Sequence, residues 1–407
     1  MLTRLLFYCI LCRSSFKTIP YAEQCEGIAM NEIPRNLQSQ VESWLFQKKI
    51  ITIFGARQVG KTTLSKAILA RHGNSKDYFN CDIPSIVSRF ENPEPVLLKR
   101  LIGDAGIIVI DEAQKVNNIG LTLKILHDEL PEVQIIATGS SSFTLRNSVS
   151  EPLTGRGIEF LLLPFSLEEL KTLYRPHELD ALLPFFMRFG LYPDVVQKDE
   201  ESARILIDNL SSKYLYRDIL EFEQLKKPEL LFNLLQLLAF QIGHEVSRNE
   251  LANTLGTSRE TIERYLDLLE KSFVIFRLKP LARNQRNEIT RKEKIYFYDI
   301  GVRNALISSF HPIDLRQDTG QVFENFMIAE RLKYLSYHGL IRNTWFWRTH
   351  DQKEIDYIEE YDGKFYAYEI KWKKGKIKQS TVGAFNNNYP ETTFSLITSE
   401  NYFTFTE

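Results

Sequence analysis

The stretch IITIFGARQVGKTTLSKAILA, residues 50–70, decides the fold of this chain. Residues 50–54 are apolar and mostly β-branched, which predicts a short buried strand. Residues 64–70 carry apolar side chains at helical spacing and predict a helix. Residues 55–62 have the spacing G-x-x-x-x-G-K-T, and this spacing between a strand and a helix predicts a loop that cradles phosphates.

Each residue type in this loop suits a phosphate ligand. Gly55 and Gly60 let the backbone curl, so that successive N–H groups point at phosphate oxygens. Lys61 can reach the β- and γ-phosphates during catalysis, and the Thr62 hydroxyl can hold Mg²⁺. The predicted residues of this ATP and Mg²⁺ site are Gly55, Ala56, Arg57, Gln58, Val59, Gly60, Lys61, Thr62 and Thr63.

A second predicted strand supplies two carboxylates. Residues 107–112, IIVIDE, are apolar up to Asp111 and Glu112. Asp111 at the end of the strand can hold Mg²⁺, and Glu112 can act as the catalytic base that polarises the attacking water. This pair of carboxylates favours hydrolysis over binding alone.

A third predicted strand ends in hydroxyl groups. It covers residues 134–142, QIIATGSSS, and either Thr138 or Ser140 can contact the γ-phosphate. Helical segments such as residues 119–130 separate these strands, which predicts a parallel sheet wrapped by helices. The continuous apolar runs agree, because a parallel sheet buries both faces.

Composition places the chain among globular proteins. It has 407 residues, enough for roughly two to three domains. Lys plus Arg is 51 and Asp plus Glu is 52, giving a formal net charge of −1, with 43% hydrophobic residues. These values exclude a disordered chain, a collagen and a uniformly basic nucleic-acid coat. The 4 cysteines, without a His-rich tract, are expected to be reduced thiols.

The N-terminus allows two interpretations. Residues 1–12 are apolar but shorter than the ~20 residues that span a membrane. They resemble a short signal h-region, with Tyr21-Ala22 as a cleavage site. Met30 begins a second plausible start, so we expect residues 1–29 to be a disordered extension of a cytoplasmic protein with no membrane partner.

Five short stretches together resemble one protein family. They are GARQVGKTT, IIVIDEAQKV, ATGSSS, LTGR and LLLPFSLEEL. Over residues 30–375 the chain is similar to AAA-type ATPases of the bacterial and archaeal group that carries a C-terminal DUF4143 domain. The resemblance makes Arg156 a candidate arginine for the γ-phosphate, with an ordinary surface arginine as the alternative.

The predicted architecture is α/β: a P-loop NTPase parallel sheet, a helical and winged-helix middle, and a small α/β nuclease-like C-terminal domain. The predicted parts are an extension at 1–29, an ATPase domain at 30–165, a helical segment at 166–227, a winged-helix-like domain at 228–300 and a DUF4143-like domain at 301–407.

The winged-helix prediction comes from residues 247–271. A helix ends before Gly256, Ser258 can cap a new helix over 259–271, and strands at 273–278 and 294–298 can form the wings. A basic patch follows, made of Arg277, Lys279, Arg283, Arg286, Arg291, Lys292 and Lys294. The helix itself is acidic, with Glu260, Glu263, Asp267 and Glu270. DNA contact and a structural or lid role therefore both remain open.

The C-terminal domain carries a possible catalytic cluster. We expect a helix over 319–338, a strand pair turning at Asp362-Gly363, and a last strand at 365–372. Glu369 and Lys371 lie two apart and share a strand face, with Asp356 on the neighbouring strand. Glu324 on the helix can add another carboxylate.

This D-x(12)-E-x-K pattern resembles the restriction-endonuclease-like PD-(D/E)XK superfamily. The resemblance implies that Asp356, Glu369 and Glu324 hold Mg²⁺ and that Lys371 activates water, whereas the alternative is an ordinary salt bridge on a strand. We therefore expect a Mg²⁺-dependent ATPase switch coupled to a nuclease-like domain that acts on DNA. The alternative is an ATPase switch whose degenerate C-terminal domain binds DNA or a protein partner. A homo-oligomer of the chain is left open as well.

Overall fold

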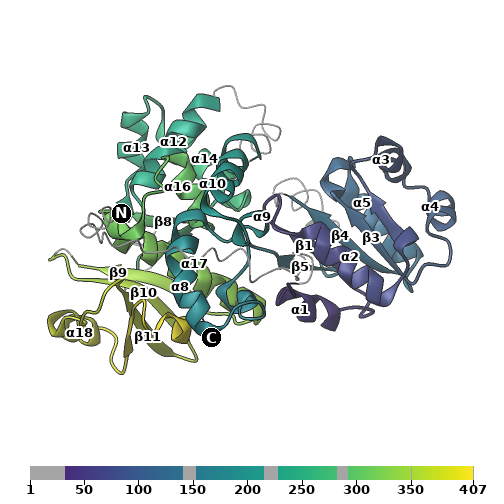
Figure 1. Ribbon diagram of the computed structural model, residues 1–407. Helices are drawn as coiled ribbons and strands as arrows, with labels where there is room; N and C mark the ends of the chain where they lie inside the picture. The colour runs from purple at the N-terminus through teal and green to yellow at the C-terminus, as the bar shows by residue number, and fades with distance from the viewer. Residues whose placement is uncertain (1–32, 141–152, 215–227, 282–291, 350, 407) are drawn as a thin grey trace, which may run out of the picture.

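The computed structural model describes residues 33–140, 153–214, 228–281, 292–349 and 351–406 (Figure 1). The expected extension at residues 1–29 lies outside these ranges. Three sheets, of five, four and three strands, organise the described chain. The five-stranded sheet and its helices form one lobe of Figure 1, and the other two sheets lie in the second lobe. Over the same ranges, every helix is too short or too polar to cross a bilayer.

The five-stranded sheet is parallel and has the order β2-β3-β4-β1-β5. Its strands are β1 (Ile50–Phe54), β2 (Tyr78–Asn80), β3 (Ile107–Asp111), β4 (Gln134–Gly139) and β5 (Gly157–Leu161). Alternate residues of β3 enter different cores, with Ile107 in one and Ile108 in the other. Both faces of the sheet are therefore buried, which confirms the predicted P-loop NTPase fold.

Helices cover both faces of this sheet. They are α1 (Leu37–Ser43), α2 (Lys61–His72), α3 (Pro84–Glu91), α4 (Pro95–Ile102) and α5 (Ile119–Glu129). Leu64 and Ile68 of α2 pack in the first core, whereas Phe90 of α3 and Leu123 of α5 pack in the second. The P-loop therefore joins a fully buried strand to a helix that is fixed on one face.

The middle of the chain is mostly helical. Its helices are α7 (Leu167–Leu170), α8 (Pro176–Phe189), α9 (Pro193–Val196), α10 (Glu200–Asn209), α12 (Pro228–Phe240), α13 (Arg248–Thr254), α14 (Arg259–Lys271) and α16 (Ile300–Leu306). A small antiparallel sheet has the order β6-β8-β7, with β6 (Glu245–Val246), β7 (Ile275–Leu278) and β8 (Glu293–Phe297). Ser258 caps α14 by accepting a bond from the Thr261 N–H, as predicted.

The C-terminal part places a long helix beside a four-stranded sheet of order β12-β11-β10-β9. Its elements are α17 (Thr319–Tyr337), β9 (Asn343–Arg348), β10 (Glu354–Tyr361), β11 (Lys364–Ile370), α18 (Gln379–Asn386) and β12 (Thr393–Ile397). The helix and the β10–β11 hairpin agree with the sequence prediction. The expectation that residues 365–372 form the last strand is wrong, because β12 follows and pairs in parallel with β11.

Candidate functional site

The P-loop has a backbone shape that its glycines permit. A Cβ atom on Gly55 would lie 2.1 Å from the carbonyl oxygen of Leu162, so a larger residue would have to displace the backbone at Leu162. Gly60 has a φ of 99° and stands at the N-terminus of α2. Gln58 has a φ of 62° and completes the curl. The loop thus presents backbone N–H groups and the positive end of α2 to one space.

Lys61 points back across the loop. Its ammonium donates to the carbonyl oxygens of Gly55 at 2.9 Å and Ala56 at 2.7 Å. The side chain is buried, with 5% of its surface exposed. The cation is therefore fixed over the loop, where β- and γ-phosphates would bind.

Asp111 is the centre of a hydroxyl cluster. Thr62 donates its hydroxyl to one carboxylate oxygen at 2.8 Å, and Tyr78 donates to the same oxygen. Thr138 donates to the other oxygen. Burial and the bond to Asp111 raise the pKa of the Tyr78 hydroxyl, so it stays a donor. Carboxylate and hydroxyl oxygens are the ligands Mg²⁺ prefers, so Thr62 and Asp111 fit the predicted ion.

Glu112 and Ser140 lie on either side of a residue that the sequence analysis missed. The side-chain amide of Gln114 donates to Ser140 at 3.0 Å and to the Glu112 carboxylate. Its amide oxygen is buried and accepts no hydrogen bond from the described residues. Thr138 also holds the backbone of Glu112 in place, because its hydroxyl accepts the Glu112 N–H at 3.2 Å. Thr138 in β4 and Ser140, which directly follows this strand, therefore both lie beside the two carboxylates.

A cavity of about 360 Å³ opens in front of the loop. Its lining includes the P-loop residues Lys61 and Thr62 together with Glu112. The apolar side chains of Ile33, Phe165 and Pro193 also line it, as do Arg35 and Asp194. The cavity thus combines polar groups that suit phosphates with apolar groups that could contact a nucleoside.

Arg35 connects this cavity to two other parts of the chain. Its guanidinium donates to the P-loop carbonyl of Val59 and to the carbonyl of Leu163, both at 2.6 Å. It also donates to the Tyr337 hydroxyl of α17 at 3.3 Å and pairs with Glu169 at 2.9 Å. Only 8% of its surface is exposed. No local pattern marks Arg35, because its partners are distant in the sequence.

Arg156 does not join this site within the chain. Its carbonyl accepts the N–H of Ile50, the first residue of β1, at 2.8 Å. The P-loop follows Phe54 at the other end of β1, about 13 Å away at the usual rise per residue. Arg156 instead pairs with Asp128 at 3.0 Å. The correction follows from parallel pairing, because a residue before β5 lies at the amino ends of the strands.

The C-terminal candidates do come together. By the register of β10 and β11, Asp356 stands opposite Glu369. Asp356 accepts the backbone N–H of Ile370 at 2.8 Å, and Lys371 pairs with Glu369 at 2.9 Å. Burial, with Glu324 beside it, raises the pKa of Asp356 well above its ordinary value.

A lysine from the middle of the chain occupies this cluster. The Lys294 ammonium on β8 lies 3.0 Å from Glu324 and 2.6 Å from Glu354. Tyr296 donates to the same Glu324 oxygen at 2.6 Å. Within the described ranges, no group of three or more His, Cys, Asp or Glu residues could hold a metal ion. Of the residues predicted to bind Mg²⁺ here, Glu324 is therefore paired with the Lys294 ammonium and Glu369 with Lys371.

Two described residues of the predicted basic patch, Arg277 and Lys294, are paired with acids. Arg277 binds three acids of α14, Glu263 at 2.9 Å, Asp267 at 2.7 Å and Glu270. Lys294 is buried, and Arg283, Arg286 and Arg291 lie outside the described residues. The acids of α14 thus serve the fold, and the patch offers fewer free cations than the sequence suggests.

Three family models match the chain. Residues 47–171 match an AAA domain, residues 181–312 match a domain of unknown function (DUF8612), and residues 319–406 match a domain of unknown function (DUF4143). The chain therefore combines an AAA domain with a DUF4143 domain. With the P-loop geometry, the AAA match supports an ATP-binding ATPase.

Similar proteins have been found in bacteria and archaea. An uncharacterized protein of Mycobacterium tuberculosis is 28% identical over 341 residues, 83% of this chain and 73% of the relative. An uncharacterized protein of Methanocaldococcus jannaschii is 26% identical over 346 residues, 79% of this chain and 74% of the relative.

Solved structures show weaker likeness. A DNA replication initiation factor aligns with a TM-score of 0.26 and 16% identity, covering 61% of this chain and 90% of its own. Drosophila ORC bound to AT-rich DNA and Cdc6 aligns with a TM-score of 0.23 and 11% identity, covering 68% of this chain and 93% of its own.

Proposed function

We propose that this protein is a Mg²⁺-dependent ATPase switch whose C-terminal domain binds a partner protein. The observation that carries the proposal is Arg35. One guanidinium bonds the P-loop carbonyl of Val59 and the Tyr337 hydroxyl of α17. A change at the phosphates can thus reach the C-terminal domain through a single side chain.

The residues of the AAA domain divide the work of hydrolysis. The loop N–H groups and Lys61 bind and orient the phosphates. Thr62 and Asp111 would hold Mg²⁺, which when bound neutralises charge on the β- and γ-phosphate oxygens. Glu112 accepts a proton from the attacking water, and Gln114 with Ser140 orients the base and the γ-phosphate. Arg35 and Phe165 line the same cavity.

Transmission follows from how tightly Arg35 is held. Its neighbours Leu163 and Glu169 belong to the segment that follows β5, and Tyr337 also accepts the Leu163 N–H at 3.0 Å. A shift of the Val59 peptide on nucleotide binding therefore cannot be absorbed by Arg35 alone. It moves the end of α17 or breaks a buried hydrogen bond, which costs about 1–3 kcal/mol.

The Lys294 ammonium favours a binding role for the C-terminal domain. It sits between Glu324 and Glu354, where a metal-dependent nuclease would need free carboxylates. The second candidate is an ATP-linked nuclease acting on DNA. It is favoured by the pairing of Asp356 opposite Glu369, next to Lys371.

Hydrogen–deuterium exchange of α17 tests the switch. In a Glu112→Gln protein, which should bind ATP without turnover, we expect ATP with Mg²⁺ to slow exchange around Tyr337 at least threefold. Tyr337→Phe removes the hydroxyl that Arg35 binds, so it should abolish this difference while ATP affinity stays within about twofold. Tyr334→Phe, on the same helix, is the matched control. Equal exchange with and without ATP in the parent protein would overturn the switch.

A cleavage assay separates the two candidates. Labelled single- and double-stranded DNA is incubated with Mg²⁺ or Mn²⁺, with and without ATP. We expect no cleavage beyond that of an Asp356→Ala protein. Cleavage that disappears in both Asp356→Ala and Lys371→Ala would establish the nuclease instead.

A further inference from the structure

Within the residues that the structure describes, two sheets of the second lobe meet edge to edge at the bridge between Pro280 and Phe346. β7 is an edge of the small sheet and β9 is an edge of the C-terminal sheet. Beyond β7, the Lys279 carbonyl accepts the Phe346 N–H at 3.0 Å, and the Leu281 N–H donates to the Phe346 carbonyl at 2.7 Å. The bridge at Pro280 and Phe346 is parallel. From this junction the strands run back towards their N-termini without further pairing between them.

Both strands turn backbone groups that no described residue bonds towards the space between them. In β7, the Val274 carbonyl bonds the Tyr298 N–H, and the Lys279 carbonyl bonds β9. Because bonding alternates along an antiparallel strand, the N–H and C=O of Arg277 must point away from β8. In β9, Phe346 faces β7, so by the same alternation Thr344 faces it too.

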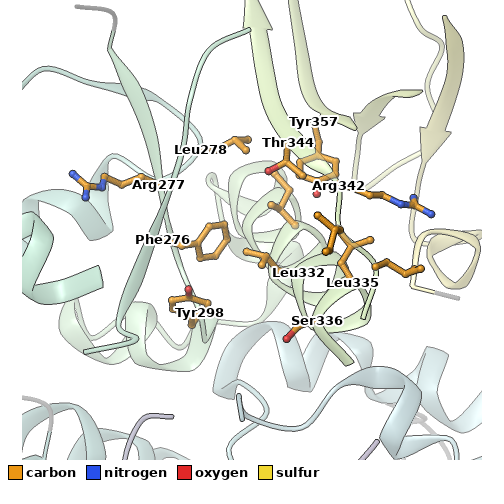
Figure 2. Close-up of a pocket in the computed structure, with 13 residues that line it drawn as sticks. Phe276, Arg277, Leu278, Tyr298, Leu332, Leu335, Ser336, Arg342, Thr344 and Tyr357 are labelled. Atoms are coloured by element: carbon orange, nitrogen blue, oxygen red, sulfur yellow. The ribbon is translucent and has the colours of Figure 1, made fainter. Parts of the chain in front are cut away.

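A cavity of about 370 Å³ fills the space between the strands (Figure 2). Leu332 and Leu335 of α17 form its floor, and Phe276 and Leu278 project from β7 (Figure 2). Ile341, two residues before β9, also lines it and is 96% exposed. The space therefore has an apolar floor between two rows of open backbone groups.

We propose that this gap between β7 and β9 binds an extended peptide segment of a partner protein. The segment would continue the existing β7–β9 junction, pair with the open groups at Arg277 and Thr344, and place alternate apolar side chains on the α17 floor. A nucleic acid has neither the backbone pattern nor the apolar side chains to match. This inference rests on the proposed partner-binding role and gives that role its surface.

The gap also lies next to the contact between Arg35 and Tyr337, which is proposed to transmit the nucleotide state to α17. Leu335 and Ser336 line the gap, and Tyr337, the following residue of α17, bonds Arg35. A shift of α17 at Tyr337 therefore moves the floor of the gap. The nucleotide state can thus change the affinity for the segment.

Peptide display on the full-length protein tests the site. A library of random ten-residue peptides is selected on the protein with ATP and Mg²⁺, in the Glu112→Gln background. We expect enriched peptides with apolar residues at alternate positions. Leu335→Trp fills the floor and should weaken binding of the selected peptides at least tenfold. Leu315→Trp, at a side chain that is 77% exposed and outside the gap, is the control.

A second variant covers the case in which Leu335→Trp fails to fold. Thr344→Pro removes an N–H that no described residue uses, and it should also weaken binding at least tenfold. No enriched peptide, or binding unchanged in the folded variants, would overturn the site. Exchange at Tyr337 that still responds to ATP would then leave the ATPase switch standing.

Discussion

Lys294 is a cation that the fold has taken out of water. Its side chain is 1% exposed. Burial alone would lower its pKa, but Glu324, Tyr296, Asp356 and Glu354 raise that pKa well above the ordinary value. The ammonium is therefore charged at every physiological pH and holds β8 against α17 and β10.

Replacing Lys294 should be costly. Lys294→Met leaves Glu324 and Glu354 facing each other without their counter-ion, and we expect a loss of about 3 kcal/mol in the free energy of unfolding. Lys99→Met, at an exposed pair with Glu129, should lose less than about 1 kcal/mol. Urea unfolding followed by circular dichroism measures both. Equal losses would show that the buried ammonium does not hold the cluster.

Some residues of the nucleotide site belong to short sequence motifs, whereas others depend on partners that are far away in the sequence. Lys61, Thr62, Asp111 and Glu112 follow from motifs a few residues long, and the structure brings them together. Arg35 could not be predicted, because its partners at Glu169 and Tyr337 are 134 and 302 residues away. Tyr78 and Gln114 could not be predicted for a related reason, because their contacts form only when β2, β3 and β4 lie side by side.

At the scale of elements, the start of α17 is fixed by an acid. Asp318 binds Arg316 at 2.8 Å and Arg303 of α16 at 2.7 Å. Both arginines are 2% exposed. Burial alone would raise the pKa of Asp318, but these two arginines lower it to about 2. Asp318 thereby links the start of α17 to α16.

This pairing predicts a pH dependence of stability. A carboxyl group with a lowered folded pKa stabilises the fold above its unfolded value near 4, and the contribution disappears as the pH falls from about 4 to 2. Asp318→Asn should therefore cost up to about 2 kcal/mol at pH 7 and much less near pH 2. Urea unfolding at several pH values checks this, with Asp128→Asn as the exposed control. A cost that is the same at both pH values would exclude a charge effect.

Elements with a local signal were predictable. The strands β1, β3 and β4, the helix α17 and the hairpin at Asp362 follow from apolar periodicity and turn residues. The strand β12 was missed because Thr393–Ile397 is short and only partly buried. Its position depends on pairing with β11, which no local pattern reports.

At the scale of the molecule, α17 is buried on nearly every side. Glu330 accepts the Leu167 N–H at 2.6 Å, and Lys333 donates to the Phe165 carbonyl at 2.8 Å. On another side, Arg331 pairs with Glu359 of β10 at 2.6 Å. The helix thus belongs as much to the segment after β5 as to its own sheet.

The C-terminal part should therefore not fold alone. A fragment of residues 313–407 loses the partners of Glu330, Lys333 and Tyr337, and we expect it to lack a cooperative thermal transition. A fragment of residues 163–407 loses Arg35 but keeps Leu167, Phe165 and Leu163, which bond Glu330, Lys333 and Tyr337, and it should unfold cooperatively. Differential scanning calorimetry distinguishes them. A cooperative transition of the shorter fragment would make the DUF4143 region an independent domain.

The Arg35–Tyr337 bond has a consequence for the order in which the chain is made. Tyr337 follows Arg35 by 302 residues, so at ordinary translation speeds of about 5–20 residues per second it emerges roughly 15–60 s later. The nascent AAA domain can form its parallel sheet and P-loop during this interval, but the Arg35 contact with α17 is still missing. A ribosome-bound intermediate can therefore hold nucleotide before α17, the helix that would respond to it, has been synthesised.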